Sequence, residues 1–101
     1  MTTQELFACR TIVDHYGADD QRNILIEECG ELVQAAAKMN RPAKDDTEKL
    51  LRRENFIEEL ADVSIMIEQM KSSLTVSERK MFNDFVAYKI MRQLERIQNE
   101  R

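Results

Sequence analysis

The sequence has few of the residues that form tight turns, with two glycines and one proline in 101 residues. An all-β fold joins many short strands through such turns, so their scarcity argues against that class. No stretch alternates apolar and polar residues for long enough to indicate a strand. An all-α fold is the remaining interpretation, and the chain length suits a single domain covering residues 1–101.

Cysteine and histidine, the residues of zinc sites and disulfides, are also scarce. Cys9 and Cys29 match no zinc or redox spacing, and we expect two free thiols, as in a reducing cytoplasm. His15 is the only histidine, which argues against a ferritin-like di-iron site because that site takes a Glu-x-x-His motif from each of two helices. No apolar run approaches the roughly 20 residues of a membrane span, and the N-terminus lacks a signal-peptide pattern. The sequence therefore predicts a cytoplasmic protein without a membrane partner.

Basic charge is scarce in the first three quarters of the chain. Residues 1–75 carry nine basic and fifteen acidic side chains, a net charge of −6, whereas residues 76–101 carry a net charge of +2. An acidic body argues against binding to a nucleic-acid polymer, which needs clustered Lys and Arg. It suits the capture of a hard divalent cation instead.

Residues that cap or end helices divide the chain into four predicted helices. The first three end at about Tyr16, Asn40 and Ser72, and the fourth runs nearly to the C-terminus. Gly17 and Pro42 end the first two, because glycine tolerates a left-handed turn and the residue before proline avoids the helical conformation. The N-terminal caps are expected to be Thr2 or Thr3, Asp19 or Asp20, one of Asp45 to Thr47, and Thr75 or Ser77.

Two pairs of carboxylates, one on each central helix, are the main functional signal. Glu28 and Glu31 lie three residues apart on the second predicted helix, and Glu59 and Asp62 lie three apart on the third. Residues with this spacing share a helix face, with Cβ atoms roughly 5–6 Å apart. Each pair can therefore reach one cation or two neighbouring cations.

The spacing of apolar residues places these acids on or beside the faces that should pack inward. On the third helix, Leu60 and Val63 lie within about one turn of the acids and are expected to face the core. Four unpaired carboxylates there would repel, and desolvation would cost several kcal/mol each. A divalent cation removes both penalties, and Mg²⁺ also takes substrate phosphates as ligands. The alternative is neutralisation in salt bridges by Lys38, Arg52 or Arg53.

At these acids the sequence resembles the MazG-like branch of the all-α nucleoside triphosphate pyrophosphatases. The family pattern is ExxE on one helix and ExxD on the next, which here is Glu28-x-x-Glu31 and Glu59-x-x-Asp62. The resemblance covers nearly the whole chain, from about residue 10 to residue 97. The segments that match around the motifs are residues 27–32 and 58–63, and the lead-in Tyr16-Gly17 followed by Gln21.

The resemblance implies a four-helix bundle, assembled as a dimer or tetramer, that hydrolyses a nucleoside triphosphate. Cleavage of an NTP or dNTP between the α and β phosphates would give the monophosphate and pyrophosphate, and would remove noncanonical or surplus nucleotides. Glu27 or Glu28 would accept a proton from the attacking water, and the sequence does not choose between them. The ligands of Mg²⁺, or of Mn²⁺ as its substitute, would be Glu28, Glu31, Glu59 and Asp62.

Basic residues late in the chain are the candidates for contact with the substrate's phosphates. Lys89 and Arg92 are the best matches to basic residues with that role in the family, and Asn55, one turn before Glu59, is a further candidate. Alternatively, Lys89 and Arg92 only complement the dipole near a helix C-terminus. With no tryptophan, and only four Phe and two Tyr to stack on a base, the base preference stays open.

Two other functions stay open beside this one. One is a helical interaction module whose acids are only solvated surface charge. The other is a degenerate family member that binds nucleotide without turnover. Apolar residues on more than one face of the long helices predict self-association, and the resemblance implies a homodimer or homotetramer.

Overall fold

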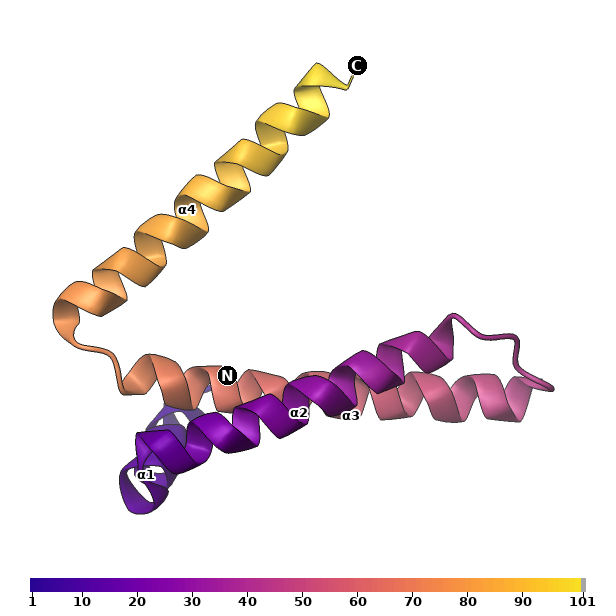
Figure 1. The fold of residues 1–101 in the computed structure, drawn as a ribbon, viewed down its shortest axis with the longest axis horizontal. Coiled ribbons are helices and arrows are strands. Elements are labelled where there is room, and N and C mark those ends of the chain that lie inside the picture. Colours follow the sequence, from indigo (N-terminus) through magenta and orange to yellow (C-terminus); the bar gives the residue numbers. More distant parts are fainter. Residues whose placement is uncertain (101) are drawn as a thin grey trace.

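The computed structural model describes residues 1–100, and this part of the chain contains four helices and no strand (Figure 1). The helices are α1 (Thr3–Tyr16), α2 (Ala18–Met39), α3 (Asp46–Ser72) and α4 (Val76–Asn99). The predicted all-α class is therefore confirmed. No helix among these residues is long and apolar enough to cross a lipid bilayer.

Side-chain caps fix where three of the helices begin. The Thr2 hydroxyl accepts a hydrogen bond from the Glu5 backbone N–H at 3.1 Å, while the Glu5 carboxylate accepts one from the Thr2 N–H at 2.7 Å. Thr75 and Glu78 form the same reciprocal box at the start of α4. At α3 the Asp45 carboxylate accepts from the Glu48 N–H at 2.8 Å. These local bonds satisfy backbone donors that the helices leave unpaired.

The second helix begins differently from the prediction. Neither Asp19 nor Asp20 caps it, because α2 starts directly after Gly17 and both aspartates lie in its first turn. Gly17 has a φ of +93°, a conformation that lets the chain turn from α1 into α2 within a single residue. The two aspartates still favour the helix N-terminus through their charge.

The packed body consists of α1, α2 and α3. Helices α2 and α3 run antiparallel along most of their length, and α1 lies across the end where α2 begins (Figure 1). Its buried apolar residues come from all three helices: Cys9, Val13, Ala35, Val63 and Met66. Both cysteines are free thiols, as predicted.

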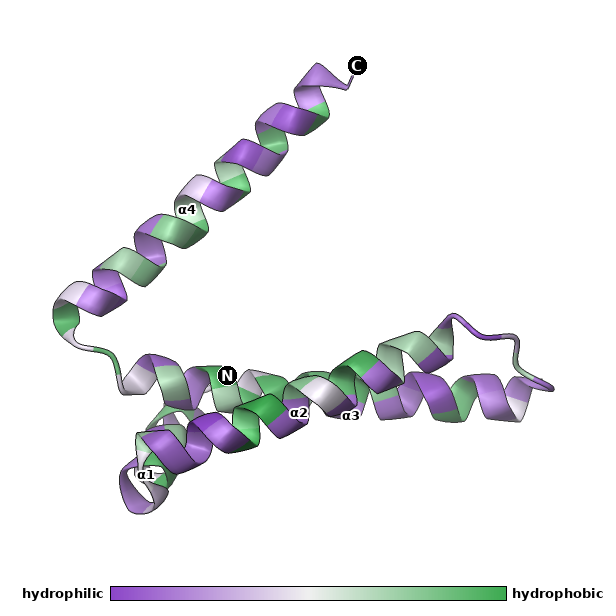
Figure 2. Ribbon diagram, viewed as in Figure 1, coloured by the Kyte–Doolittle hydropathy of each residue, from purple (hydrophilic) through white to green (hydrophobic). Residues whose placement is uncertain are grey.

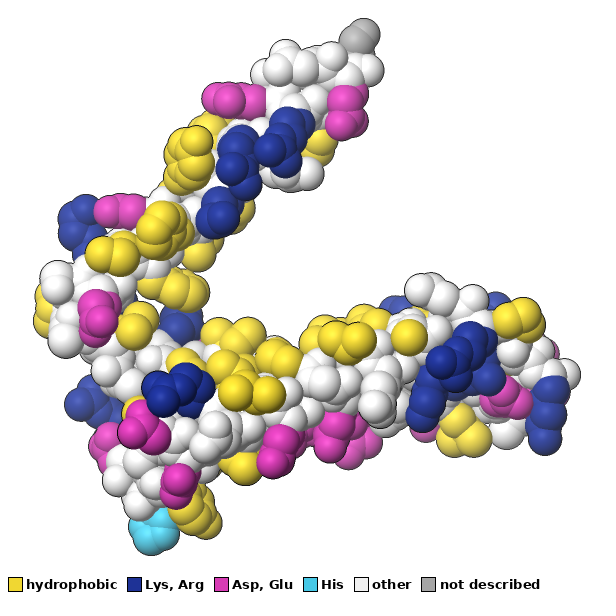
Figure 3. All heavy atoms as spheres, viewed as in Figure 1, with side chains coloured by type: hydrophobic (Ala, Val, Ile, Leu, Met, Phe, Trp, Pro, Cys, Tyr) yellow, Lys and Arg dark blue, Asp and Glu magenta, His cyan; other side chains and the backbone are white. Residues whose placement is uncertain are grey.

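Helix α4 projects away from this body. None of its residues is buried, and it makes hardly any contact with the other helices (Figure 1). At its start Arg79 donates a hydrogen bond to the Lys71 carbonyl at 2.9 Å, which ties it to the end of α3. Hydrophobic residues alternate with polar ones along α4 (Figure 2). They also gather on the face of the α2–α3 body that is turned toward α4 (Figure 3).

The exposed apolar surface includes a position that was expected to be buried. Val63 is buried as predicted, but Leu60 is 42% exposed. The core of one chain is too small to cover every apolar face of α3, and α4, which could cover one, lies elsewhere.

Candidate metal centre

The antiparallel packing of α2 and α3 brings three of the four predicted carboxylates together. Glu28 on α2 and Glu59 and Asp62 on α3 each offer an oxygen, and these oxygens all lie within 4.8 Å of one another. All three side chains are half-buried. We call these three residues the acidic cluster. Negative charge is also concentrated along one edge of the α2–α3 body (Figure 3).

Two oxygens of the acidic cluster have no hydrogen-bond partner among residues 1–100. They are Oε2 of Glu28 and Oε2 of Glu59, and both are shielded from solvent. Buried polar atoms in proteins are nearly always hydrogen-bonded. An ionised carboxylate only accepts hydrogen bonds, so a neighbouring carboxylate cannot satisfy it without a proton. The carboxylate oxygens of this site can therefore bind a cation. Among residues 1–100, no protein group donates a hydrogen bond to the two buried oxygens.

The fourth predicted ligand, Glu31, lies at the rim of the acidic cluster. It is exposed and is not among the three residues that converge within 4.8 Å. Its charge nevertheless acts on the others. Burial raises the pKa of Glu28 and of Glu59, and the negative charges of Glu31 and Asp62 raise both pKa values further. Each added negative charge makes the ionised form of its neighbours less favourable.

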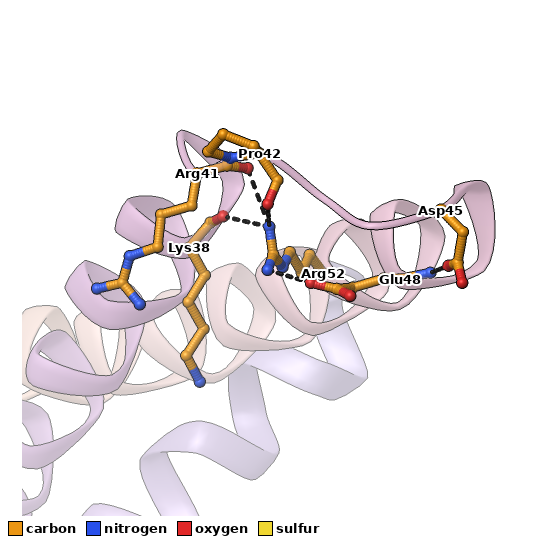
Figure 4. Close-up of polar contacts among 6 residues, drawn as sticks. All are labelled: Lys38, Arg41, Pro42, Asp45, Glu48 and Arg52. Carbon is orange, nitrogen blue, oxygen red and sulfur yellow. Dashed lines mark hydrogen bonds and ion pairs between the residues drawn. The ribbon is translucent and has the colours of Figure 1, made fainter.

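No basic side chain neutralises the acidic cluster in residues 1–100. None of its members takes part in an ion pair there. Arg52, which the sequence offered as a neutralising residue, is committed to the turn between α2 and α3 (Figure 4). The salt-bridge alternative is therefore wrong for Arg52, and Lys38 and Arg53 form no ion pair in the described chain either.

The chemistry of these donors fits a hard divalent cation. Three converging carboxylates, with a fourth at the rim, supply only oxygen ligands, which Mg²⁺ and Mn²⁺ prefer. No cysteine or histidine joins the group, which argues against a zinc site. Bound charge of the opposite sign would remove the mutual repulsion that raises the two pKa values.

The candidate residues for catalysis and substrate binding are spread more widely. Asn55 is half-buried on α3, one turn before Glu59. Glu27 is exposed on α2 and lies outside the acidic cluster, whereas its neighbour Glu28 belongs to it. Lys89 and Arg92 are exposed on α4. Because α4 projects from the body, the structure does not bring these two cations to the acidic cluster of their own chain (Figure 1).

A second group of charged residues was not singled out from the sequence. A hollow of about 830 Å³ lies at the turn between α2 and α3, and several basic side chains line it. Its signal in the sequence is the density of Lys and Arg from Lys38 to Arg53, where six basic residues accompany three acidic ones. The two Arg residues that end this stretch were considered only as partners for the acids.

Comparison with known proteins adds no relative: no family model, no curated protein and no solved structure matches this chain.

Proposed function

We propose that this protein is a magnesium-dependent nucleoside triphosphate pyrophosphohydrolase of the MazG-like all-α type. The observation that supports this most strongly is the acidic cluster, because Glu28 and Glu59 face each other across α2 and α3 with unsatisfied oxygens. Acids that formed only a solvated surface would point into water and would not lose accessibility together. Their spacing in ExxE and ExxD motifs adds the family resemblance to the geometry.

The residues of the cluster would hold the cation, with Glu31 completing the set from the rim. Bound magnesium supplies positive charge for the phosphates and lowers the pKa of a bound water. In phosphoryl transfer the protein contributes mainly position and electrostatic stabilisation. Glu28 is a better proton acceptor for the attacking water than Glu27, because Glu27 lies exposed outside the cluster. Asn55, half-buried one turn before Glu59, would donate a hydrogen bond to a phosphate oxygen.

Assembly would provide what one chain lacks. Most of the stability of a helix in a protein comes from tertiary packing, and α4 buries none of its residues. Leu60 and Ile67 on α3 present apolar surface that is 42% exposed at each, and Phe85 on α4 is 55% exposed. We propose that α4 of a second copy covers this surface in a homodimer or homotetramer. The bundle would then be completed between chains, and Lys89 and Arg92 of the partner subunit would approach the phosphates.

A turnover assay tests the activity directly. A panel of NTPs and dNTPs is incubated with protein and Mg²⁺, and the release of monophosphate and pyrophosphate is measured. We expect turnover of at least one nucleotide and its loss in Glu59→Gln, which removes a charge that would hold the cation. Glu58→Gln is the matched control, since it makes the same change one residue away on an exposed position. Equal turnover by Glu59→Gln and wild type would contradict the proposal.

Cation binding without turnover would identify a degenerate member instead. A ligand that binds only the folded state raises the melting temperature, so millimolar Mg²⁺ with nucleotide should raise Tm in either case. A rise in Tm with Mg²⁺ that Glu59→Gln lacks, together with no product from any nucleotide, favours the binding protein. No rise in Tm with Mg²⁺, Mn²⁺ or nucleotide favours the interaction module, for which the exposed apolar surface of α4 is the supporting observation.

A further inference from the structure

The hollow at the turn between α2 and α3 has the size of a small-molecule site. Its volume of about 830 Å³ lies within the roughly 300–1,000 Å³ typical of ligand pockets. Besides Arg52, four basic residues line it, namely Arg41, Lys44, Lys49 and Arg53. Met39 and Leu50 add apolar surface beside them. The combination of several cations with an apolar wall suits a ligand that carries both anionic and apolar parts.

These four cations are not paired within the part of the chain that the structure describes. None of them takes part in an ion pair in residues 1–100. Asp45, which also lines the hollow, is committed to capping α3 through the Glu48 N–H. Basic side chains gather at this end of the α2–α3 body (Figure 3). Asp46 also lines the hollow, so five basic residues there face two acidic ones. On a chain with a net charge of −4, this local excess of positive charge creates a site for an anion.

A fifth cation holds the walls of the hollow in place. The guanidinium of Arg52 donates hydrogen bonds to the carbonyls of Lys38, Arg41 and Pro42, at 3.2, 2.9 and 3.3 Å (Figure 4). It also pairs with Glu48 on its own helix. Arg52 therefore fastens the end of α2 and the turn to α3. A site whose walls are already fixed loses less freedom when a ligand binds.

The hollow is separate from the acidic cluster. Lys49 and Arg53 are four residues apart and so share one face of α3. Arg53 precedes Glu59 by six residues, which on an α-helix is about 9 Å along the axis and about 120° around it. A ligand held by Lys49 and Arg53 therefore lies on another face of α3 from the cluster.

We propose that this hollow binds a phosphorylated small molecule without a divalent cation, at a site distinct from the metal centre. The phosphates contact Arg41, Lys44, Lys49 and Arg53, because charge-assisted hydrogen bonds to Arg and Lys are the strongest that phosphate oxygens form in proteins. The apolar part of the ligand covers Met39 and Leu50. The site does not depend on the pyrophosphohydrolase activity and adds a binding function to it.

The test is a calorimetric titration of the full chain with ADP in the presence of EDTA, which removes any metal-mediated binding. We expect saturable binding to wild type. In Lys49→Gln/Arg53→Gln the loss of two charge-assisted contacts should weaken the affinity by about tenfold or more. Arg41→Gln, on the opposite wall, should weaken it independently. The matched control is Arg10→Gln/Arg22→Gln, which removes the same charge from exposed positions on α1 and at the start of α2, outside the hollow, and should bind ADP as wild type does.

Several results would overturn the proposal. They are an absence of ADP binding in EDTA, an equal loss in the Arg10→Gln/Arg22→Gln control, and tighter binding of duplex DNA than of ADP. Circular dichroism of each variant confirms that its helices remain, and all four basic positions are exposed. Glu59→Gln should keep full ADP binding in EDTA, and loss of binding there would also overturn the separation of the two sites. Absence of nucleotide turnover would reject the proposed activity while this binding is still expected.

Discussion

Neighbouring glutamates in this protein experience opposite environments. Glu27 and Glu58 are exposed, while Glu28 and Glu59, each one position later, are half-buried and face one another across two helices. A step of one residue turns a helical side chain by about 100°, which is enough to move it from water to the packed face. The chemistry of the site follows from this helical phase and not from the number of acids in the chain.

A first prediction concerns Glu59→Gln in the absence of metal. Burial and the charges of Glu31 and Asp62 raise the pKa of Glu59, so its ionised form destabilises the fold at neutral pH. In EDTA at neutral pH, Glu59→Gln should therefore melt a few degrees above wild type. Because the folded-state pKa is the higher one, the folded state binds this proton more tightly than the unfolded state does. The contribution of Glu59 to stability thus falls as pH rises from the usual glutamate value through the raised value.

Thermal melts at a series of pH values measure this effect. The difference between variant and wild type should be largest above the raised pKa and should shrink as the pH is lowered toward the usual glutamate range. Glu54→Gln, which changes an exposed glutamate on the same helix, is the control and should melt like wild type at each pH. Millimolar Mg²⁺ should raise the Tm of wild type more than that of Glu59→Gln. A variant that melts below wild type in EDTA would show that Glu59 is already satisfied.

At the scale of the helices, alanine substitutions at the two glycines are predicted to change the stability of the protein in opposite directions. Gly17 has a φ of +93° at the junction of α1 and α2, so Gly17→Ala should destabilise the protein by about 1 kcal/mol or more through backbone strain. Gly30 lies inside α2, and nothing stands within 4 Å of where a Cβ would be. Gly30→Ala should therefore stabilise the protein by about 0.5–1 kcal/mol.

Urea denaturation of both variants checks this pair, and each serves as the control for the other. Stability changes of the same sign in both variants would contradict this prediction. A loss of stability in Gly30→Ala would mean that another surface approaches α2 closely at that point. Such a result would locate a contact between chains beside Glu28 and Glu31.

The helices were predictable because their signals are local. Thr2, Asp45 and Thr75 cap helices within three residues of themselves, and α2 ends at Met39, close before Pro42 and one residue short of the predicted end. The cap at Asp19 or Asp20 was predicted wrongly because the sequence does not reveal the φ of Gly17. Once Gly17 turns the chain alone, no further residue is needed before α2.

The candidate site was predictable only in part, for a related reason. Helical periodicity states which residues share a face, so Glu59 could be paired with Asp62 from the sequence. Periodicity does not indicate which helix packs against α3. The structure was therefore needed to show that Glu28 converges with these two residues. The same limit applies to α4, whose direction is set by no local pattern. It also applies to the hollow at the α2–α3 turn, where the lining comes from two helices and their connection.

At the scale of the whole molecule, α4 presents apolar residues on two opposite sides. Met81, Phe85 and Tyr88 follow the spacing of one helix face, and Ile90, Leu94 and Ile97 follow the same spacing on another. Nine residues separate Met81 from Ile90, which places these two faces half a turn apart. All six side chains are exposed. The first and second halves of α4 thus have apolar surface available for different neighbours.

A further prediction follows for the size of the protein in solution. Light scattering coupled to size exclusion should give two or four times the chain mass of 11.9 kDa. Phe85→Glu should shift this toward a single chain, because it places a charge in the apolar face. Asn83→Glu adds the same charge nearly on the opposite side of that helix half and should leave the mass unchanged. A wild-type mass of 11.9 kDa at every concentration would contradict self-association.

The isolation of α4 also bears on how long the protein survives in a cell. Helix α4, about a quarter of the chain, is hardly packed against the other helices. Only contact with other molecules can therefore protect it from proteases. In the proposed homo-oligomer, coverage of α4 by a second copy obeys mass action and increases with the concentration of the chain. In that assembly, chains at low concentration would be cleaved at α4 more readily than chains at high concentration, so the expression level would affect the lifetime of the protein.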